Sequence, residues 1–390
     1  MDYAKKALEA HAKWQGKLDI VSKPKLETSD DLAIAYTPGV AAPCLEIEKD
    51  PEAAYVYTGR GNTIAVVSDG SAVLGLGNIG GLAGLPVMEG KCVLFKELGH
   101  VNAVPIVLSV QDPDQIVEAV AALEPSFGGI NLEDIAAPKC FEVEAKLQER
   151  MNIPVFHDDQ HGTACVVLAA MINALKLTGK NKETAKVVFS GAGAAGSAIA
   201  KLLADYGFKN IRQCDLQGII TPDNAANPMQ KELAERLNPR GESGTLKDAL
   251  KGADIFIGVS KGNLVDQEMI RSMNENAIVF AMANPTPEIA PDLAKEAGAR
   301  VVGCGRSDYP NQINNVLIFP ALFRGALDAK ATRITEGMKM AAAKALADLI
   351  PEDELRDDYV IVSALDPRVC DAVAAAVAQA AREEGVVRHG

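Results

Sequence analysis

The sequence lacks the features that mark disulfide-stabilised and membrane-spanning proteins. Its seven cysteines are scattered, and the two closest, Cys140 and Cys165, are 25 positions apart, so there is no C-x-x-C motif. Such a set is typical of reduced thiols in a cytosolic protein. No uncharged stretch reaches the roughly 18 residues that a transmembrane helix needs, and the N-terminus has no apolar signal-peptide core. We therefore expect a cytoplasmic protein.

A basic block is also lacking. The formal net charge is −13 at pH 7. Nucleic acid and anionic membrane surfaces repel an acidic chain, so we expect neither as a partner. An anionic small molecule would have to be held by local lysine or metal charge against this global field.

Internal repeats and flexible linkers are absent as well, and 390 residues suggest two domains that share a cleft. Short apolar runs bounded by Gly or Pro predict buried strands at 63–68, 103–110, 128–132, 153–157, 185–190, 210–214, 254–259, 277–282 and 300–303. Helical patterns are found at 2–15, 138–150, 162–177, from after residue 196 to about 206, and at 341–348 and 370–382. This alternation indicates an α/β fold with largely parallel sheets.

A glycine motif follows one of these strands and opens a helix. Gly191, Gly193 and Gly196 form G-x-G-x-x-G, and Asp215 ends the next expected strand. This context predicts a dinucleotide site, with the pyrophosphate at the helix N-terminus and the acid at a ribose hydroxyl. Asp215 favours NAD over NADP, because it would repel a 2′-phosphate. A second copy of the motif at 75–80 is followed by poor helix formers and fits a structural turn or a substrate loop equally well.

Two acidic doublets stand where two expected strands end. Glu133 and Asp134 follow one strand, and Asp158 and Asp159 follow another. One doublet alone is typical of helix capping. Two doublets at the carboxyl ends of neighbouring strands would form an oxygen-rich pocket, which a hard divalent cation such as Mg²⁺ or Mn²⁺ would make tolerable.

Other titratable residues are individually ambiguous. His157 and His161 have zinc-like spacing, but they do not share a helix face and no third ligand is near, so ordinary polar roles are favoured. Lys91 lies within an apolar run, either as an edge residue that reaches water or as a buried amine with a lowered pKa. Tyr36 precedes a Pro-Gly turn and is by itself an ordinary aromatic residue.

Taken together, these motifs resemble those of the malic enzyme family, in its short prokaryotic form. The resemblance rests on segments that occur in the family's order: Tyr36–Ala41, Ser68–Gly70, Leu74–Gly77, Glu89–Lys91, Asn131–Asp134, Phe156–Thr163, Ala283–Thr286 and Asn314–Val316. It implies oxidative decarboxylation of L-malate to pyruvate and CO₂ with NAD or NADP and a divalent cation. It also implies a homodimer, in which one subunit completes the other's site.

The resemblance also implies roles for individual residues. Glu133, Asp134 and Asp159 match metal ligands, and Asp158 matches a carboxylate one shell further out. Lys91 matches the general base and Tyr36 the general acid. The substrate and dinucleotide positions are Asn284, Asn315, Thr163, Gly191, Gly193, Gly196 and Asp215.

One position departs from the family pattern. Larger members carry an arginine for the substrate carboxylate where Ser71 and Ala72 stand here. Its role must fall to the metal, to asparagines, to backbone amides or to Lys96.

The predicted organisation has three parts. Residues 1–157 form a substrate and metal domain, 158–314 a doubly wound Rossmann-type domain, and 315–390 helices that return to the first domain. Three alternatives remain. An amino-acid dehydrogenase would not need the four carboxylates, and an inactive NAD-binding regulator would be expected to have lost Tyr36, Lys91 or a metal ligand. A malolactic enzyme would keep the whole site and release lactate.

Overall fold

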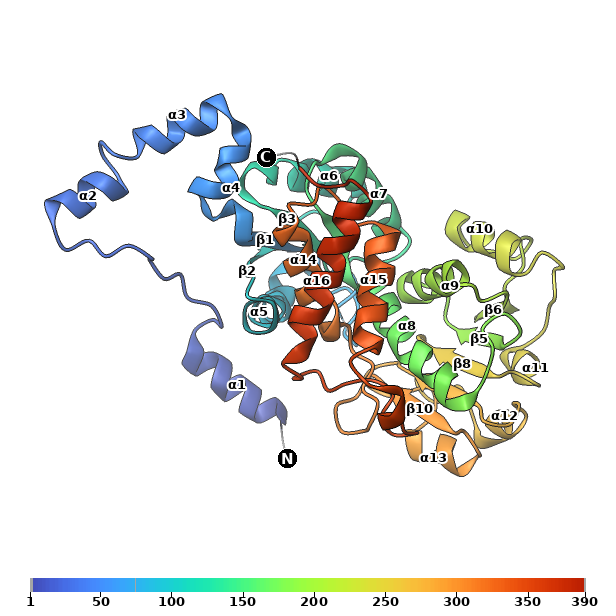
Figure 1. Cartoon of the computed structure of the whole chain (residues 1–390). Coiled ribbons are helices and arrows are strands. Elements are labelled where there is room, and N and C mark those ends of the chain that lie inside the picture. The colour runs from blue at the N-terminus through green and yellow to red at the C-terminus, as the bar shows by residue number, and fades with distance from the viewer. Residues whose placement is uncertain (1–2, 74, 389–390) are drawn as a thin grey trace.

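The computed structural model describes residues 3–73 and 75–388, so Leu74 of the segment Leu74–Gly77 lies outside the described residues. It contains two sheets with helices on their faces, which confirms the α/β prediction (Figure 1).

The first sheet has four parallel strands in the order β2-β1-β3-β4. They are β1 (Thr63–Ser68), β2 (Asn102–Val107), β3 (Gly129–Leu132) and β4 (Val155–His157). Side chains alternate across β1, as a strand requires. Ile64 and Val66 pack toward the core shared with α5 (Gly80–Gly99), whereas Ala65 and Val67 pack toward α6 (Pro113–Ala121) and α7 (Lys139–Arg150).

The second sheet has the order β10-β9-β8-β5-β6-β7, and every pairing except that of β7 is parallel. This is a doubly wound Rossmann-type order in which a short antiparallel strand takes the place of one edge strand. Its strands are β5 (Lys186–Ser190), β6 (Asn210–Asp215), β7 (Gly218–Ile219), β8 (Ile255–Gly258), β9 (Ile278–Ala281) and β10 (Val301–Cys304). The helices along this part of the chain are α9 (Ala194–Tyr206), α10 (Pro228–Leu237), α11 (Leu246–Leu250), α12 (Gln267–Arg271) and α13 (Pro291–Glu296).

Helix α8 (Asp158–Thr178) connects the two sheets. It contacts α9 of the Rossmann-type part and α15 (Glu336–Ala347) of the C-terminal part. Helix α14 (Phe319–Asp328) packs on α5, and α16 (Arg368–Glu383) packs on both α14 and α15. One hydrophobic core therefore runs from the first sheet through α8 to the second. By length and composition α8 could also span a membrane, but most of it is buried inside the molecule, as in the core helix of a soluble protein.

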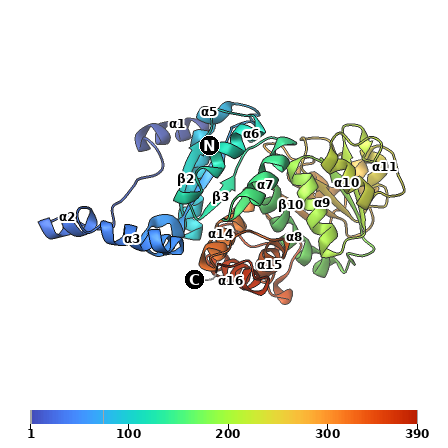
Figure 2. The same ribbon diagram turned by 90° about the horizontal axis from the view of Figure 1, so that it is seen from above.

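Residues 3–57 form an arm whose middle part extends away from the body (Figures 1 and 2). Its helices are α1 (Tyr3–Trp14), α2 (Ser29–Ala35), α3 (Ala41–Lys49) and α4 (Ala54–Tyr57), and none of them has a buried residue. The arm nevertheless carries many exposed large apolar side chains: Leu8, Ile20, Val21, Leu26, Leu32, Ile34, Leu45 and Val56.

Short 3-10 helices complete the described structure: η1 (Pro51–Ala53), η2 (Gly59–Asn62), η3 (Glu124–Ser126), η4 (Asn315–Leu317) and η5 (Glu352–Glu354).

Two segments differ from the sequence prediction. The stretch after residue 79, where the poor helix formers gave no helix prediction, forms the long helix α5 with Pro86 inside it. Helix α8 begins at Asp158, directly after β4, and not at residue 162. The second acidic doublet is therefore the first turn of a buried helix.

Candidate active site

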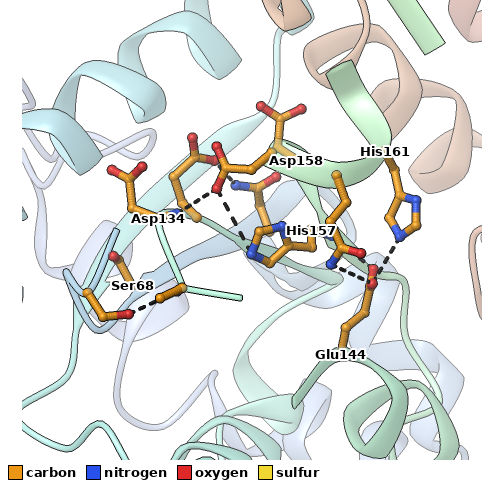
Figure 3. Close-up of polar contacts among 12 residues, drawn as sticks. Ser68, Asp134, Glu144, His157, Asp158 and His161 are labelled. Atoms are coloured by element: carbon orange, nitrogen blue, oxygen red, sulfur yellow. Dashed lines mark hydrogen bonds and ion pairs between the residues drawn. The ribbon is translucent and has the colours of Figure 1, made fainter. Parts of the chain in front are cut away.

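The candidate site lies at the carboxyl ends of the first sheet. Because β3 and β4 are parallel and pair Leu132 with His157, the residues that follow them emerge side by side. Glu133 and Asp134 come from one strand end, and Asp158 and Asp159 from the first turn of α8. Figure 3 labels one acid of each doublet, Asp134 and Asp158. The predicted gathering of the two doublets is therefore present in the structure.

Three of these acids form a cluster suited to a metal ion. One oxygen each of Glu133, Asp134 and Asp159 lies within 4.8 Å of the others, and Glu133 and Asp134 are buried. The backbone N–H of Asp134 also donates to Asp159 Oδ2 at 2.9 Å. Three converging carboxylates are the donor set that a hard divalent cation takes, so the residues fit Mg²⁺ or Mn²⁺.

The negative charge of this cluster is only partly compensated, by Lys91. Burial, followed by the charges of Asp159 and Glu133, raises the pKa of Asp134 to about 8. Burial also raises the pKa of Glu133, against the opposing effect of Lys91. The cluster thus resists full ionisation by itself, as expected for acids that share a site with a cation.

Lys91 is buried between two carboxylates. Its Nζ lies 2.8 Å from Glu133 Oε1 and 2.5 Å from Asp158 Oδ2, and 3.9 Å from the centre of the Phe319 ring. Burial acts to lower the pKa of Lys91, but the charges and hydrogen bonds of Asp158 and Glu133 outweigh it and raise that pKa. Of the two alternatives that the sequence left open, the structure shows the buried amine, but with a raised pKa instead of a lowered one, because the two acids lie in direct contact.

Asp158 links Lys91 to the C-terminal part of the chain. It is fully buried, and it accepts hydrogen bonds from both Lys91 and the side-chain amide of Asn315, at the start of η4. Burial raises its pKa to about 6, partly offset by Lys91. Asn315 was expected at the substrate, and the structure places it beside Lys91 through this shared partner.

The region of the missing arginine is occupied by a compact polar turn. Ser71 Oγ donates to Asp69 Oδ1 and accepts from the backbone of Ala136. The backbone N–H of Ala72 donates to the carbonyl of Asp134. Lys96 was one possible replacement, but its Nζ bonds Asn102 at the exposed edge of the sheet. The structure therefore does not bring Lys96 to the carboxylates.

Two predicted residues lie outside the cluster. Tyr36 ends α2 on the arm, and 67% of its surface is exposed. Asn284 is exposed on the loop after β9, and no contact found within residues 3–73 and 75–388 joins it to the carboxylates.

The dinucleotide loop has the predicted geometry. Gly191 follows β5 with a φ of +109°, and a Cβ on Gly196 would lie 2.1 Å from the carbonyl oxygen of Gly191. Gly193 is the N-cap of α9, and a Cβ there would meet no atom within 4 Å. The loop therefore offers open space at the N-terminus of α9, where a pyrophosphate binds in folds of this type.

Asp215 ends β6 as predicted and remains exposed. Its Oδ2 accepts from Gln230 on α10, which also bonds the carbonyl of Ala192 in the glycine loop. Arg236 is on the same helix but pairs with Asp205, and Thr163 lies half-buried in the second turn of α8. The acid is thus held beside the glycine loop, while Arg236 is engaged elsewhere.

Two residues near Lys91 were missed by sequence reasoning. Asn131 is fully buried and donates to Glu133 Oε2 at 2.9 Å, and the ring of Phe319 lies under the Lys91 ammonium. Asn131 could have been found, because it is two positions before Glu133 and so shares its face of β3. Nothing local in the sequence links Phe319 to Lys91.

A Rossmann-type sheet with a glycine loop, joined to a site lined with carboxylates, fits an enzyme that binds a dinucleotide. Two family models match the chain: the malic enzyme N-terminal domain over residues 15–148 and the malic enzyme NAD-binding domain over residues 160–382. The chain therefore belongs to the malic enzyme family, as the sequence motifs predicted.

Known relatives match over nearly the whole chain. The bifunctional malic/malolactic enzyme of Bacillus subtilis is 56% identical over 390 residues, which is 100% of this chain and 95% of the relative. The NAD-dependent malic enzyme of Geobacillus stearothermophilus is 53% identical over 96% of this chain and 78% of its own length. The crystal structure of malic enzyme from Pyrococcus horikoshii Ot3 is 49% identical with a TM-score of 0.95, covering 99% of this chain and 92% of that one.

Proposed function

We propose that this protein oxidises L-malate to pyruvate and CO₂ with reduction of NAD⁺ or NADP⁺, in the presence of Mg²⁺ or Mn²⁺. The observation that carries the proposal is the group formed by Glu133, Asp134 and Asp159 with Lys91 buried against Glu133. The similarity to an NAD-dependent malic enzyme of Geobacillus stearothermophilus, over 96% of this chain and 78% of that one, supports it.

We assign the metal to Glu133, Asp134 and Asp159. A divalent cation there supplies a Lewis acid for the oxygens of malate and for the charge that develops during decarboxylation. The raised pKa of Asp134 means that the cluster gives up a proton when it binds a cation.

Lys91 is our candidate for the base that accepts the malate hydroxyl proton as hydride leaves for the nicotinamide. That role needs the neutral amine. A metal cation bound to Glu133 would neutralise the charge that raises the pKa of Lys91. The neutral form of the Lys91 amine would then be favoured. Asp158 holds the amine in place from the other side, and we place Asn315 and Asn284 at the substrate.

For the dinucleotide, we propose binding at Gly191, Gly193 and Gly196 with Thr163 nearby and the adenosine ribose at Asp215. Leu216 and Gln217 follow Asp215, and neither brings a positive charge for a 2′-phosphate. We therefore expect NAD to be preferred over NADP.

The arm is the basis for proposing a homodimer. Tyr36 is exposed on a segment whose apolar side chains have no cover in a single chain. We propose that the arm packs on a second copy and brings Tyr36, the candidate acid that protonates C3 of enolpyruvate, to the partner's Lys91. We also place the enzyme in the cytoplasm, in keeping with seven cysteines that are all free.

The test is an assay of the full chain with L-malate and Mn²⁺, with NAD⁺ and NADP⁺ run in parallel. We expect reduced dinucleotide and pyruvate in equal amounts, and loss of both on removal of the metal with a chelator. No turnover with either dinucleotide would contradict the proposal.

A second product deserves measurement, because the Bacillus subtilis relative is named as bifunctional malic/malolactic. A malolactic activity would release lactate without net reduction of the dinucleotide. Quantifying lactate and pyruvate in the same reaction distinguishes the two activities.

A further inference from the structure

Glu144 is a buried acid that the proposed chemistry does not use. It lies on α7, whose other buried side chains are Cys140, Val143 and Leu147. Only 6% of its surface is exposed. A buried carboxylate is costly unless its oxygens are satisfied, so its partners show what it holds in place.

The partners of Glu144 lie at the start of α8. Its Oε1 accepts from the backbone N–H of His157 at 3.0 Å, and its Oε2 accepts from Gln160 at 3.2 Å. Oε2 also lies 2.9 Å from Nε2 of His161 (Figure 3). A further bond comes from Gln148 on the same helix. One carboxylate thus ties together the last residue of β4 and the first turn of α8.

This turn has no cap of its own. His157 is the N-cap residue of α8, but its side chain makes no capping hydrogen bond. The N-terminus of a helix has unsatisfied N–H groups and attracts negative charge. Glu144 supplies both an acceptor and a negative charge from a neighbouring helix.

The carboxylate is held in its ionised form. Burial acts to raise the pKa of Glu144, but the charges of His161, His157 and Lys339 and the bond from His161 outweigh burial and keep that pKa below its ordinary value. His161 is itself fixed from the far side, since its Nδ1 lies 3.2 Å from Lys339 Nζ on α15.

We propose that Glu144 is a positioning residue for the metal cluster: by fixing the start of α8, it aims Asp158 and Asp159 at Glu133 and Asp134. The inference rests on the proposed function, because it assumes that Glu133, Asp134 and Asp159 bind the metal. Residues that orient metal ligands from outside the ligand set typically change metal affinity by 10- to 100-fold when they are replaced.

The test is Mn²⁺ binding to the metal-free full chain, measured by calorimetry together with the melting temperature. Glu144→Gln keeps the side-chain shape but replaces one acceptor oxygen with a donor. We expect its Mn²⁺ affinity to fall by about tenfold. Glu142→Gln, exposed on the same helix, removes the same charge and should bind Mn²⁺ within about twofold of the unmodified chain.

A folded Glu144→Gln variant that binds Mn²⁺ within about twofold of normal would overturn the inference, as would an equal loss in Glu142→Gln. If Glu144→Gln does not fold, the same Mn²⁺ binding measurement on Gln160→Met tests the inference. This substitution removes one donor to the same carboxylate, and we expect affinity to fall by about threefold, whereas no change would count against the idea. A failure of the proposed function would be seen in the unmodified chain, which would then bind no Mn²⁺ or leave malate unchanged. A failure of the present inference would be seen only in the variants.

Discussion

At the residue scale, Lys91 is the sharpest test of the chemistry. Lys91→Arg keeps a positive charge between Glu133 and Asp158 but cannot act as a base near neutral pH. We expect the rate of NADH formation from L-malate to fall by at least about 100-fold, the usual size of a general-base contribution. NADH binding, followed by fluorescence, should stay near normal. Near-normal malate oxidation by this variant would refute the assignment.

Lys91→Ala should show how strongly this lysine also supports the metal-free fold. The change removes the ammonium group that pairs with two buried carboxylates. Breaking a buried ion pair in this way lowers the free energy of unfolding by about 3–5 kcal/mol. Urea unfolding without metal measures the loss. Unfolding free energies that match those of the unmodified chain would contradict the buried ion pairs.

The acidic residues could be predicted from sequence because their rule is local. A doublet directly after a buried strand must emerge at the sheet edge, and neighbouring parallel strands bring two such doublets together. The pKa direction of Lys91 could not be predicted in this way. Its partners are 42 and 67 positions away, so only the folded chain shows that they contact its Nζ.

At the element scale, the glycine loop offers a matched pair of changes. A Cβ on Gly193 has open space, and its φ of −79° suits alanine, so Gly193→Ala should leave the melting temperature unchanged. That Cβ would occupy the space left for the dinucleotide, and we expect NADH affinity to fall by about tenfold.

Gly196→Ala should lower both NADH affinity and the melting temperature, because its Cβ would overlap the backbone of Gly191. Fluorescence titration and thermal melts distinguish the two variants. Equal behaviour of the pair would show that the loop does not approach a ligand as proposed.

Helix α5 shows where local rules fail. Glycine and proline disfavour helices, so the stretch that includes Gly81, Gly84 and Pro86 did not predict one. In the structure a Cβ on Gly81 would lie 2.6 Å from the carbonyl oxygen of Leu108. The glycine lets α5 approach the loop after β2 closely. This tertiary contact outweighs the low helix propensity of glycine, and no local sequence pattern reveals it.

Glu336 pairs with Lys201 and Lys339 where α15 meets α9, and we expect this contact to make stability depend on pH. Burial acts to raise the pKa of Glu336, but Lys339 and Lys201 outweigh it and lower it from 4.5 to about 2. The ionised acid therefore stabilises the fold above pH 4.5, and this contribution is lost as the pH falls toward 2. Because Glu336 is half exposed, Glu336→Gln should cost about 1 kcal/mol or less at pH 7.

Urea unfolding at several pH values between 7 and 3 tests this prediction. The gap between Glu336→Gln and the unmodified chain should stay constant from pH 7 to about pH 5 and shrink only as the pH falls further. Glu149→Gln, which is exposed on α7, serves as the control for charge. A gap that is independent of pH would mean that the ionised carboxylate is not what joins these helices.

At the scale of the whole molecule, the arm is the feature that a single chain does not explain. Its middle part stands clear of the body (Figure 2), and its helices bury no residue, yet it presents aliphatic side chains along much of its length. Exposed apolar surface of this kind marks an interaction site. The sequence located Tyr36 within a motif, but only the structure shows that this motif stands apart from Lys91.

Mixed dimers test whether a second copy of the chain brings its Tyr36 next to Lys91. We would co-express two inactive variants, Tyr36→Phe and Lys91→Arg, and purify the resulting random mixture of dimers. If each site combines Tyr36 of one subunit with Lys91 of the other, a mixed dimer has one site with both changes and one with neither. Since half of a random mixture is mixed dimer, activity should return to about a quarter of that of the unmodified protein. If Tyr36 and Lys91 of the same chain shared a site, every site in the mixture would carry one change, and no activity would return.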